Sequence, residues 1–320
     1  MVTGITFVSE ERSGRVITHE IAYSAVAEAF IAAARPQAAV FPAVVGHGSD
    51  PKNQFTVKSG TSEALAGVKI GTYFPSNDDR GLPRHGTSIL LIDQKTGRIG
   101  AVVEAARVNA FRTAAANAVA TDALARTESH RLAIFGTGHQ ALFEVLALVR
   151  VRPISRVLVV GRRESSAREF RASLVEHGLD IPIDLVSAER ACAEADIIVT
   201  ATLSSAPLFS SAAVRPGTHI SCMGADTRGK QELPPELFER STLFCDLPTQ
   251  SVVIGEFQHA PESSELIAIG RVLDGEHSGR TSQSETTVFD SSGIALQDLY
   301  VASAILRRLD AVETESVSVV

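Results

Sequence analysis

The central part of the chain alternates between short apolar runs and segments with helical spacing, from about residue 131 to residue 270. The first unit is a strand pattern at 132–135, which meets a glycine turn and then a helix through Val149. The same pattern predicts further strands at 156–160, 183–186, 196–201, 219–223 and 242–246, and helices at 165–176 and 188–193. Strands that alternate with helices imply right-handed crossovers and a parallel, doubly wound sheet. The sequence therefore predicts an α/β protein.

The two ends of the chain have a different pattern, with Ala-rich helices predicted at 17–34 and 108–125. A strand is predicted at 67–73, and a hairpin pairs 88–93 with 99–103. The segment 293–309 is a further helix that lies beyond the alternating region. The domains that follow from this pattern are a doubly wound domain at 126–292 and a second, α+β domain at 1–125 that is completed by 293–320.

The segment 132–141 has the spacing Gly-x-Gly-x-x-Ala between a strand and a helix. Gly136 permits a tight turn, Gly138 lets the backbone approach a pyrophosphate, and the small Ala141 lets the helix pack closely on the strand. The helix N-terminus supplies N–H groups and a partial positive charge to the phosphates. The predicted cofactor-binding residues are Gly136, Thr137, Gly138, His139 and Gln140. The alternative is a glycine-rich turn that binds no ligand.

Two arginines, Arg162 and Arg163, follow the second predicted strand of the central region. An NAD enzyme usually places an acidic residue there for the ribose hydroxyls, whereas an NADP enzyme places arginine for the 2′-phosphate. The arginines therefore favour NADPH. NADH stays open, because one arginine can stack on adenine while the other is solvated. The predicted cofactor is NAD(P)H.

The composition limits the class of protein. The chain has 320 residues, 44% of them hydrophobic, and its net charge of −7 excludes a globally basic nucleic-acid binder. No apolar run reaches the roughly 20 residues that cross a bilayer, and no secretory signal is visible at the N-terminus. The three cysteines are far apart and lack metal-binding spacing. We expect a cytoplasmic enzyme without a metal, and neither a nucleic acid nor a membrane as its partner.

Several motifs outside the glycine loop carry a resemblance. They are Gly67-Val-Lys69-Ile, Gly81-Leu-Pro83, Arg112-Thr-Ala-Ala, Gly224-Ala-Asp226-Thr-Arg-Gly-Lys230-Gln-Glu-Leu, Ile254-Gly-Glu256, Gly279-Arg280 and Thr287-Val-Phe-Asp-Ser291-Ser-Gly293-Ile-Ala-Leu-Gln-Asp298. In this order and spacing the chain resembles the ornithine cyclodeaminase/μ-crystallin family from about Gly67 to Tyr300. The resemblance implies a central Rossmann domain. It also implies that the second domain binds the substrate and forms a homodimer.

The resemblance also implies roles for individual residues. Lys69 and Arg112 correspond to the pair that holds the α-carboxylate of the substrate, because guanidinium binds a carboxylate bidentately and lysine adds a charge or a proton. Asp226 corresponds to the acid/base residue that faces the substrate nitrogen, and Lys69 is the second candidate for that proton. On the cofactor side the implied contacts are Thr113, Lys230 and Ser291. The residues themselves leave plainer roles open, such as a turn residue for Asp226 or a helix N-cap for Ser291.

The stretch 54–60 departs from the cyclodeaminase branch of the family, which carries an acidic residue followed by Met-Pro there. In this chain Thr56 stands in place of the acid and Lys58 in place of the methionine. A cationic substrate would be repelled by Lys58, whereas a second carboxylate would be attracted, unless Lys58 points to solvent. The candidates to supply positive charge at the substrate are Lys58, Arg84 and His85.

The resemblance and the departure together imply an NAD(P)H-dependent reductase that converts a small α-imino acid to an L-amino acid. A substrate with two carboxylates is the sharpest expectation, namely iminosuccinate reduced to L-aspartate. The alternatives are a cyclodeaminase that uses NAD catalytically and releases ammonia, a pyrroline-2-carboxylate or ketimine reductase, and a non-enzymatic dinucleotide-binding protein of the crystallin type.

Overall fold

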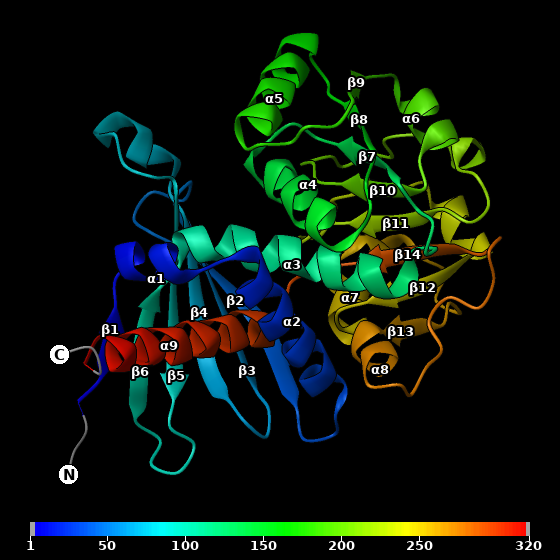
Figure 1. Ribbon diagram of the computed structural model, residues 1–320. Coiled ribbons are helices and arrows are strands. Elements are labelled where there is room, and N and C mark those ends of the chain that lie inside the picture. The colour runs from blue at the N-terminus through cyan, green and yellow to red at the C-terminus, as the bar shows by residue number, and fades with distance from the viewer. Residues whose placement is uncertain (1–3, 318–320) are drawn as a thin grey trace. The chain divides into compact units, whose positions relative to one another are not determined.

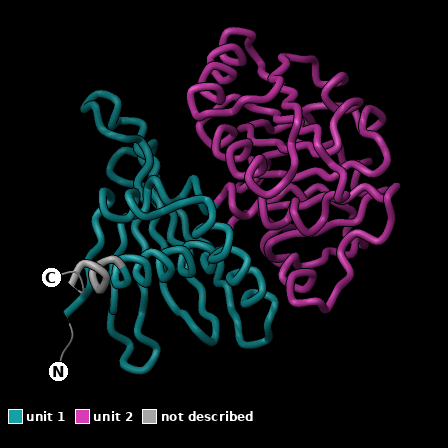
Figure 2. Tube along the Cα trace, viewed as in Figure 1, with its two compact units in different colours: residues 1–112, 294–320 teal, residues 113–293 magenta. Residues whose placement is uncertain are grey.

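The computed structural model describes the backbone of residues 4–317 and the side chains of residues 4–311. The chain divides into two compact units, Met1–Arg112 with Ile294–Val320, and Thr113–Gly293 (Figure 2). The sequence places the domain boundary after residue 125, whereas this division falls inside helix α3 (Ala106–Leu124). The residues of α3 up to Arg112 therefore belong to unit 1, and those from Thr113 onward belong to unit 2.

Unit 1 is built on a six-stranded sheet with the order β1-β6-β5-β4-β3-β2 (Figure 1). The strands are β1 (Thr6–Val8), β2 (Ala39–His47), β3 (Gln54–Thr61), β4 (Ala66–Tyr73), β5 (His85–Ile92) and β6 (Ile99–Glu104). Neighbours from β2 to β6 are antiparallel, and β1 joins β6 in parallel. The helices are α1 (Glu10–Val16), α2 (His19–Ala34) and α9 (Ala295–Val317), and η1 (Pro75–Arg80) is a 3₁₀ turn.

Helix α9 returns from the end of the chain and packs on β3, β4 and β5, with α2 beside it. In this division the last helix belongs to the same compact unit as the N-terminal segment. Strands β2 and β3 were not predicted from the sequence. Residues Phe41, Val44 and Val45 of β2 are at least half exposed, because β2 is an edge strand whose pairing with β3 is interrupted between Phe41 and Val44.

Unit 2 has an eight-stranded, wholly parallel sheet with the order β13-β12-β14-β11-β10-β7-β8-β9. The strands are β7 (Arg131–Phe135), β8 (Arg156–Val160), β9 (Ile183–Leu185), β10 (Ile197–Thr200), β11 (His219–Cys222), β12 (Ser241–Cys245), β13 (Leu266–Ala268) and β14 (Thr286–Asp290). The helices are α4 (His139–Val151), α5 (Glu164–Glu176), α6 (Ala188–Glu194), α7 (Pro248–Ile254) and α8 (Ile269–Leu273). Three 3₁₀ turns are η2 (Ser211–Ala213), η3 (Pro235–Arg240) and η4 (Glu256–His259). The predicted doubly wound α/β fold is confirmed, and β13 and β14 are additional strands.

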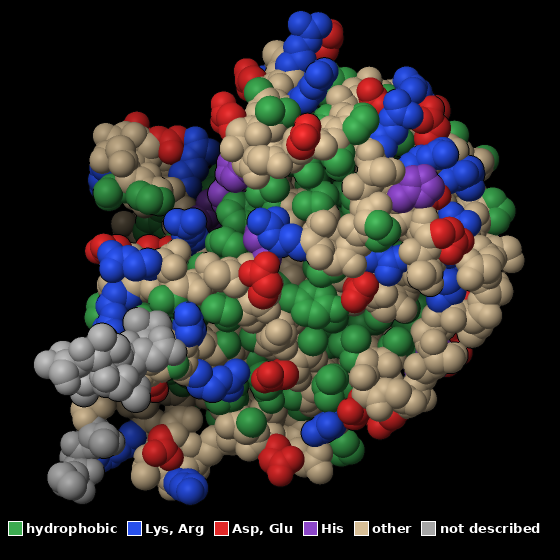
Figure 3. Space-filling model, in the orientation of Figure 1, with side chains coloured by type: hydrophobic (Ala, Val, Ile, Leu, Met, Phe, Trp, Pro, Cys, Tyr) green, Lys and Arg blue, Asp and Glu red, His purple; other side chains and the backbone are tan. Residues whose placement is uncertain are grey.

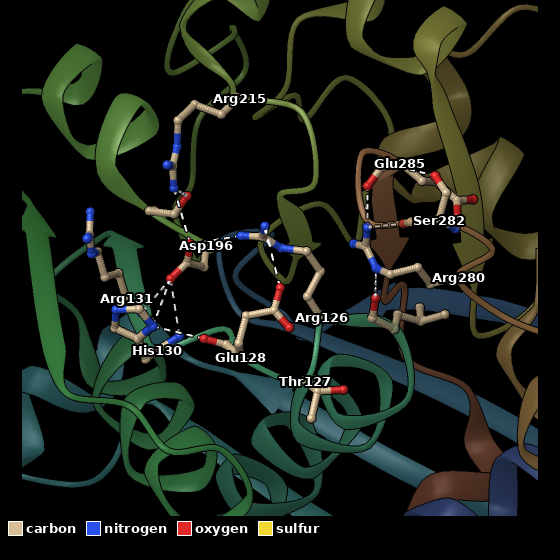
Figure 4. A network of polar contacts seen from close by, with 12 residues as sticks. Arg126, Thr127, Glu128, His130, Arg131, Asp196, Arg215, Arg280, Ser282 and Glu285 are labelled. Atoms are coloured by element: carbon tan, nitrogen blue, oxygen red, sulfur yellow. Dashed lines mark hydrogen bonds and ion pairs between the residues drawn. The ribbon is translucent and has the colours of Figure 1, made fainter.

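A network around Asp196 anchors the end of α3 at the amino-terminal edge of this sheet (Figure 4). The Asp196 carboxylate accepts hydrogen bonds from the guanidinium groups of Arg126 and Arg215 at 3.0 and 3.2 Å. It also accepts the backbone N–H groups of His130 and Arg131 at 3.2 and 3.0 Å. This edge is opposite to the carboxyl ends of the strands, where ligands bind in sheets of this kind.

The apolarity of the helices and the distribution of charged side chains bear on whether a membrane or a nucleic acid is a partner. Within residues 4–317, no single helix has the length and apolarity to cross a membrane; the pair α1 and α2 passes that test jointly but is bent by 94°. On the face that Figure 3 shows, Lys and Arg side chains are interspersed with Asp and Glu.

Candidate active site

The glycine loop of unit 2 has the geometry that a dinucleotide needs. Gly136 follows β7 with φ 115°, and a Cβ there would lie 2.5 Å from the carbonyl oxygen of Ala201, so only glycine fits. Gly138 is the N-cap of α4, so no N-cap side chain accepts a hydrogen bond from the first N–H groups of this helix. A Cβ on Gly138 would meet nothing within 4 Å, so there is room for a ligand beside the first turn of α4. The residues present therefore fit a pyrophosphate at this helix N-terminus.

The neighbouring side chains of the loop lie along α4. His139 is exposed, and its ring contacts that of Phe143 in a tilted arrangement, with 4.8 Å between the ring centroids. Gln140 donates to the carboxylate of Glu144 at 2.6 Å, and the buried Glu144 also accepts a hydrogen bond from Asn117 at 2.8 Å. These contacts hold Gln140 against α4, and the contact of His139 and Gln140 with a cofactor remains a prediction.

Arg162 and Arg163 are exposed, and they directly follow Gly161 at the carboxyl end of β8. This is the position where the adenosine ribose lies in dinucleotide-binding sheets. Thr113 of α3 is half buried. These three positions remain predicted cofactor contacts.

Asp226 and Lys230 form an ion pair in the loop after β11. The ammonium of Lys230 lies 2.5 Å from Asp226 Oδ1 and donates to the carbonyl oxygen of Gly224 at 3.1 Å. The Asp226 side chain is 56% exposed, so its carboxylate is accessible to a ligand. Ser291 is buried directly after β14, and its N–H donates to Cys222 at 3.1 Å. Because α9 begins only at Ala295, Ser291 is not the N-cap of that helix.

In unit 1, three elements bring a buried ionic cluster together. Lys69 comes from β4, Arg112 from α3 and Asp298 from α9. The Lys69 ammonium and the Arg112 Nε lie 3.1 and 3.2 Å from the same oxygen, Asp298 Oδ1. Asn109, one turn before Arg112, accepts hydrogen bonds from both cations at 2.7 Å. All three charged side chains are at least 89% buried, so the cluster is held in a site with little water.

The charges of this cluster do not balance. Burial is the largest cause that lowers the pKa of Lys69, to about 7, and the positive charges of Arg112 and Lys58 lower it further. The negative charge of Asp298 and its hydrogen bond oppose this shift. Burial disfavours the ionised form of Asp298, but the two neighbouring cations outweigh it and hold the pKa of Asp298 below its ordinary value. Excess positive charge at a dry site favours the binding of an anion.

Lys58 lies directly opposite Lys69 in the pairing of β3 with β4. Residues that are paired across two strands project from the same face of the sheet. The two side chains therefore point the same way, and the positive charge of Lys58 is among the causes that lower the pKa values of Lys69 and Asp298. This placement supports the prediction that Lys58 faces the substrate, and Lys58 is half buried.

The structure does not bring Arg84 and His85 into this cluster. Arg84 forms a two-point ion pair with Asp78, which raises the pKa of the Arg84 guanidinium, and both side chains are half exposed. His85 begins β5, and its ring contacts that of Tyr73 in a tilted arrangement with the ring centroids 4.9 Å apart. It lies four residues along the strand from Ile89, the partner of Lys69. Their contact with substrate remains a prediction, and Asp78 already balances the charge of Arg84.

Three residues of the cluster were not predicted as site residues from the sequence. Asp298 is the last residue of a family motif, and Asn109 lies one turn before Arg112 on the same helix face. Gln297 accepts a hydrogen bond from Arg112 at 3.3 Å, while its Nε2 has no partner among the described side chains. The sequence carried one usable signal, an acidic residue on an otherwise apolar helix face.

The parallel sheet and the glycine turn of unit 2 are typical of dinucleotide-binding proteins, and unit 1 adds the buried ionic cluster of Lys69, Arg112 and Asp298. A family model, the ornithine cyclodeaminase/mu-crystallin family, matches residues 7–313. The chain belongs to this family.

Similar proteins include oxidoreductases that act on imino or amino acids. The iminosuccinate reductase of Paracoccus denitrificans is 36% identical over 307 residues, covering 93% of this chain and 95% of the relative. Its crystal structure with NAD+ superposes with a TM-score of 0.87, at 35% identity and 95% coverage of both chains. An alanine dehydrogenase of Archaeoglobus fulgidus is 32% identical over 93% of both chains. The structure of an archaeal alanine dehydrogenase dimer with bound NAD has a TM-score of 0.88, at 32% identity and 97% coverage of both chains.

Proposed function

We propose that this protein is an NAD(P)H-dependent reductase of small α-imino acids and that its substrate is the dicarboxylic imine iminosuccinate, which it reduces to L-aspartate. The observation that carries this proposal is the buried cluster in which Lys69 and Arg112 share the carboxylate of Asp298, with the half-buried Lys58 paired opposite Lys69. Such a cluster favours a small molecule with more than one negative charge. The iminosuccinate reductase among the similar proteins supports the same substrate.

The residues divide the chemistry between them. The loop Gly136–Gln140 would hold the pyrophosphate of the cofactor, which supplies a hydride to the imine carbon when it is bound. Arg112 and Lys69 hold the α-carboxylate and orient the imine. Asp226 stabilises the positive charge of the protonated imine, which is the more electrophilic form. The C=N bond gains one hydride at carbon and one proton at nitrogen, which gives the amine.

The experiment that tests the function is a substrate screen that follows the consumption of reduced cofactor. The imines are iminosuccinate (from oxaloacetate and ammonia), iminopropionate (from pyruvate and ammonia) and pyrroline-2-carboxylate, each with NADH and with NADPH. We expect the fastest oxidation with iminosuccinate. If ornithine releases ammonia without net cofactor change, the protein is a cyclodeaminase. If it binds NADH but reduces no imine and deaminates no amino acid, it is a binding protein.

Replacing Lys58 with methionine tests the choice of a dicarboxylate. Loss of one charged hydrogen bond is expected to weaken transition-state binding by about 1–3 kcal/mol, which lowers kcat/KM for iminosuccinate roughly five- to 150-fold. The effect on the monocarboxylate iminopropionate should be much smaller. Lys95→Met, in an exposed hairpin turn, is the matched control and should change neither value. Equal losses for both substrates would contradict a contact between Lys58 and the second carboxylate.

The pKa of Lys69 predicts a pH dependence of anion binding. Lys69 is cationic below about pH 7 and neutral above it, so its attraction for a carboxylate is lost as the pH rises through 7. Inhibition by fumarate, a dicarboxylate that is fully ionised throughout this range, should weaken about tenfold between pH 6 and pH 8.5, the scale of one charged contact. In Lys69→Arg the guanidinium stays charged and the dependence should disappear. Inhibition that strengthens with pH would show that Lys69 is not the titrating group.

The homodimer, also part of the proposal, is supported by the exposed side chains of Phe41, Val44 and Val45 on edge strand β2. Exposed apolar edges of this kind favour association with a second chain. A cytoplasmic location, the absence of a metal, and the absence of nucleic-acid and membrane partners remain predictions from the sequence.

A further inference from the structure

The buried carboxylate of Glu232 holds two loops at the carboxyl edge of the parallel sheet. Its Oε1 accepts the N–H and the hydroxyl of Thr202, both at 2.7 Å. Its Oε2 accepts the hydroxyl of Thr200 at 2.7 Å and the N–H of Gly224 at 2.9 Å. Glu232 is 0% exposed, so these four donors replace water completely. One side chain thereby joins the loop after β10 to the loop after β11.

Two further buried acids hold Glu232 in place. Glu256 accepts the backbone N–H groups of Glu232 and Leu233, at 3.0 and 2.7 Å. Asp290 in turn accepts the N–H of Glu256 at 3.0 Å. Each carboxyl therefore fixes the backbone of the next acid along this chain of contacts, which ends at Glu232. Such an arrangement removes conformational freedom from Glu232 before any ligand binds.

The joined loops lie where a dinucleotide crosses the sheet. Strand β10 is the neighbour of β7, which carries the glycine loop, and β11 is the next strand. In doubly wound sheets the ligand lies outside the carboxyl ends of these strands. Gly224 is also packed against Glu232: a Cβ on Gly224 would lie 2.4 Å from the carbonyl oxygen of Thr202 and 2.6 Å from Glu232. Asp226 follows two residues later.

We infer that Glu232 is a positioning residue that sets the Thr202 and Gly224 loops to receive the nicotinamide half of the cofactor. This inference rests on the proposed dinucleotide binding. The other half of the cofactor, ADP-ribose, meets the Gly136 loop and the end of β8, which Glu232 does not contact. Glu232 therefore contributes to the binding of the nicotinamide half and not to that of ADP-ribose.

Glutamine is a sharp probe at this position, although it has the same shape as glutamate. Its amide nitrogen must replace either Oε1 or Oε2. In the first orientation it meets the N–H of Thr202, and in the second the N–H of Gly224. The threonine hydroxyls can rotate to become acceptors, but a backbone N–H cannot. Glu232→Gln must therefore lose one backbone contact and release one of the two loops.

Glu256→Gln is the matched control, since Glu256 is equally buried. Its Oε1 accepts both backbone N–H groups, so a glutamine oxygen there keeps both contacts. Burial raises the pKa of Glu256 to about 7, so a neutral side chain is close to its own state. A general effect of replacing a buried carboxyl with an amide would appear in both variants, whereas the loss of loop positioning would appear in Glu232→Gln alone.

The test is a titration of wild type and both variants with NADH and with ADP-ribose, in the absence of any imine. We expect Glu232→Gln to bind NADH about tenfold more weakly, the scale of one lost hydrogen bond, and to bind ADP-ribose as wild type does. Glu256→Gln should bind both as wild type does. Unchanged NADH binding in Glu232→Gln, or equal loss of both ligands, overturns the inference.

If Glu232→Gln does not fold, Thr202→Val is the second variant. It removes the hydroxyl that donates to Glu232 at 2.7 Å and accepts the N–H of Ser204 at 3.2 Å, and it should show the same selective loss to a smaller extent. Unchanged NADH binding in Thr202→Val would then overturn the inference. The titration needs no substrate, so a failed imine screen leaves it standing. Wild-type protein that binds neither ligand would overturn the proposed function and this inference together.

Discussion

Arg112→Ala is expected to lower kcat/KM for the imine about 30- to 1,000-fold, which corresponds to roughly 2–4 kcal/mol of transition-state binding. Arg112 is at least 89% buried, and its contacts are Asn109, Gln297 and Asp298. Removing the guanidinium deletes the only group of this cluster that can bind a carboxylate with two parallel hydrogen bonds. It also leaves Asp298 with Lys69 as its remaining cationic contact, which raises the pKa of Lys69 because one neighbouring cation is gone.

The measurement compares steady-state kinetics with an NADH titration of the same variant. The affinity for NADH should stay within about twofold of wild type, because one hydrogen bond to the cofactor would already be worth more than that. Arg112→Lys keeps the positive charge but lacks the two parallel N–H donors of the guanidinium, so it should recover only part of the activity. Wild-type kcat/KM in Arg112→Ala would remove Arg112 from the site, and a parallel loss of NADH affinity would assign it to cofactor binding.

The strand–turn–helix around Gly136 could be predicted from the sequence because its parts are adjacent. Ten consecutive residues, 132–141, carry the apolar strand, the turn glycines and the small residue of the helix, and the structure places β7, the turn and α4 there. The alternation of strands and helices likewise predicted the doubly wound sheet. Local sequence was sufficient wherever one element directly follows another.

Strand β14 shows where the pattern was insufficient. It is the last strand along the chain, yet it lies in the interior of the sheet between β11 and β12. All of its residues, Thr286–Asp290, are buried, so it lacks the alternation of polar and apolar positions that marks a half-exposed strand. The motif that includes this strand carries part of the family resemblance. The place of the strand in the sheet cannot be read from its place in the chain, because neighbouring strands need not be consecutive in sequence.

The ionic cluster of unit 1 could be predicted only in part for the same reason. Lys69 and Arg112 carried recognisable motifs, whereas Asp298 lies almost two hundred residues from Arg112 and contacts it because α9 packs on the sheet. The position of Lys58 depends on the register of β3 against β4, and a shift by one residue would turn it to the other face. Neither the contact of Asp298 with Arg112 nor the face on which Lys58 lies can be read from the residues that are adjacent in sequence.

The Asp226→Asn variant is expected to bind NADH and substrate as wild type does but to react at least about 100-fold more slowly, the usual scale for an acid/base group. Asparagine has the same shape and can keep the loop, but it carries no negative charge and cannot exchange a proton with the imine nitrogen. Stability should change by less than about 1 kcal/mol, because the lost ion pair with Lys230 involves a side chain that is 56% exposed.

Lys230→Met separates the chemistry of Asp226 from the ion pair itself. Both variants remove the ion pair between Lys230 and Asp226, but only Asp226→Asn removes the carboxylate. If the carboxylate acts on the imine, Lys230→Met retains most of kcat and changes chiefly the affinity for the cofactor, which Lys230 is predicted to contact. Equal losses of kcat in both variants would mean that the ion pair shapes the loop after β11, and the proton at nitrogen would then have to come from Lys69, whose pKa of about 7 allows it to donate near neutral pH.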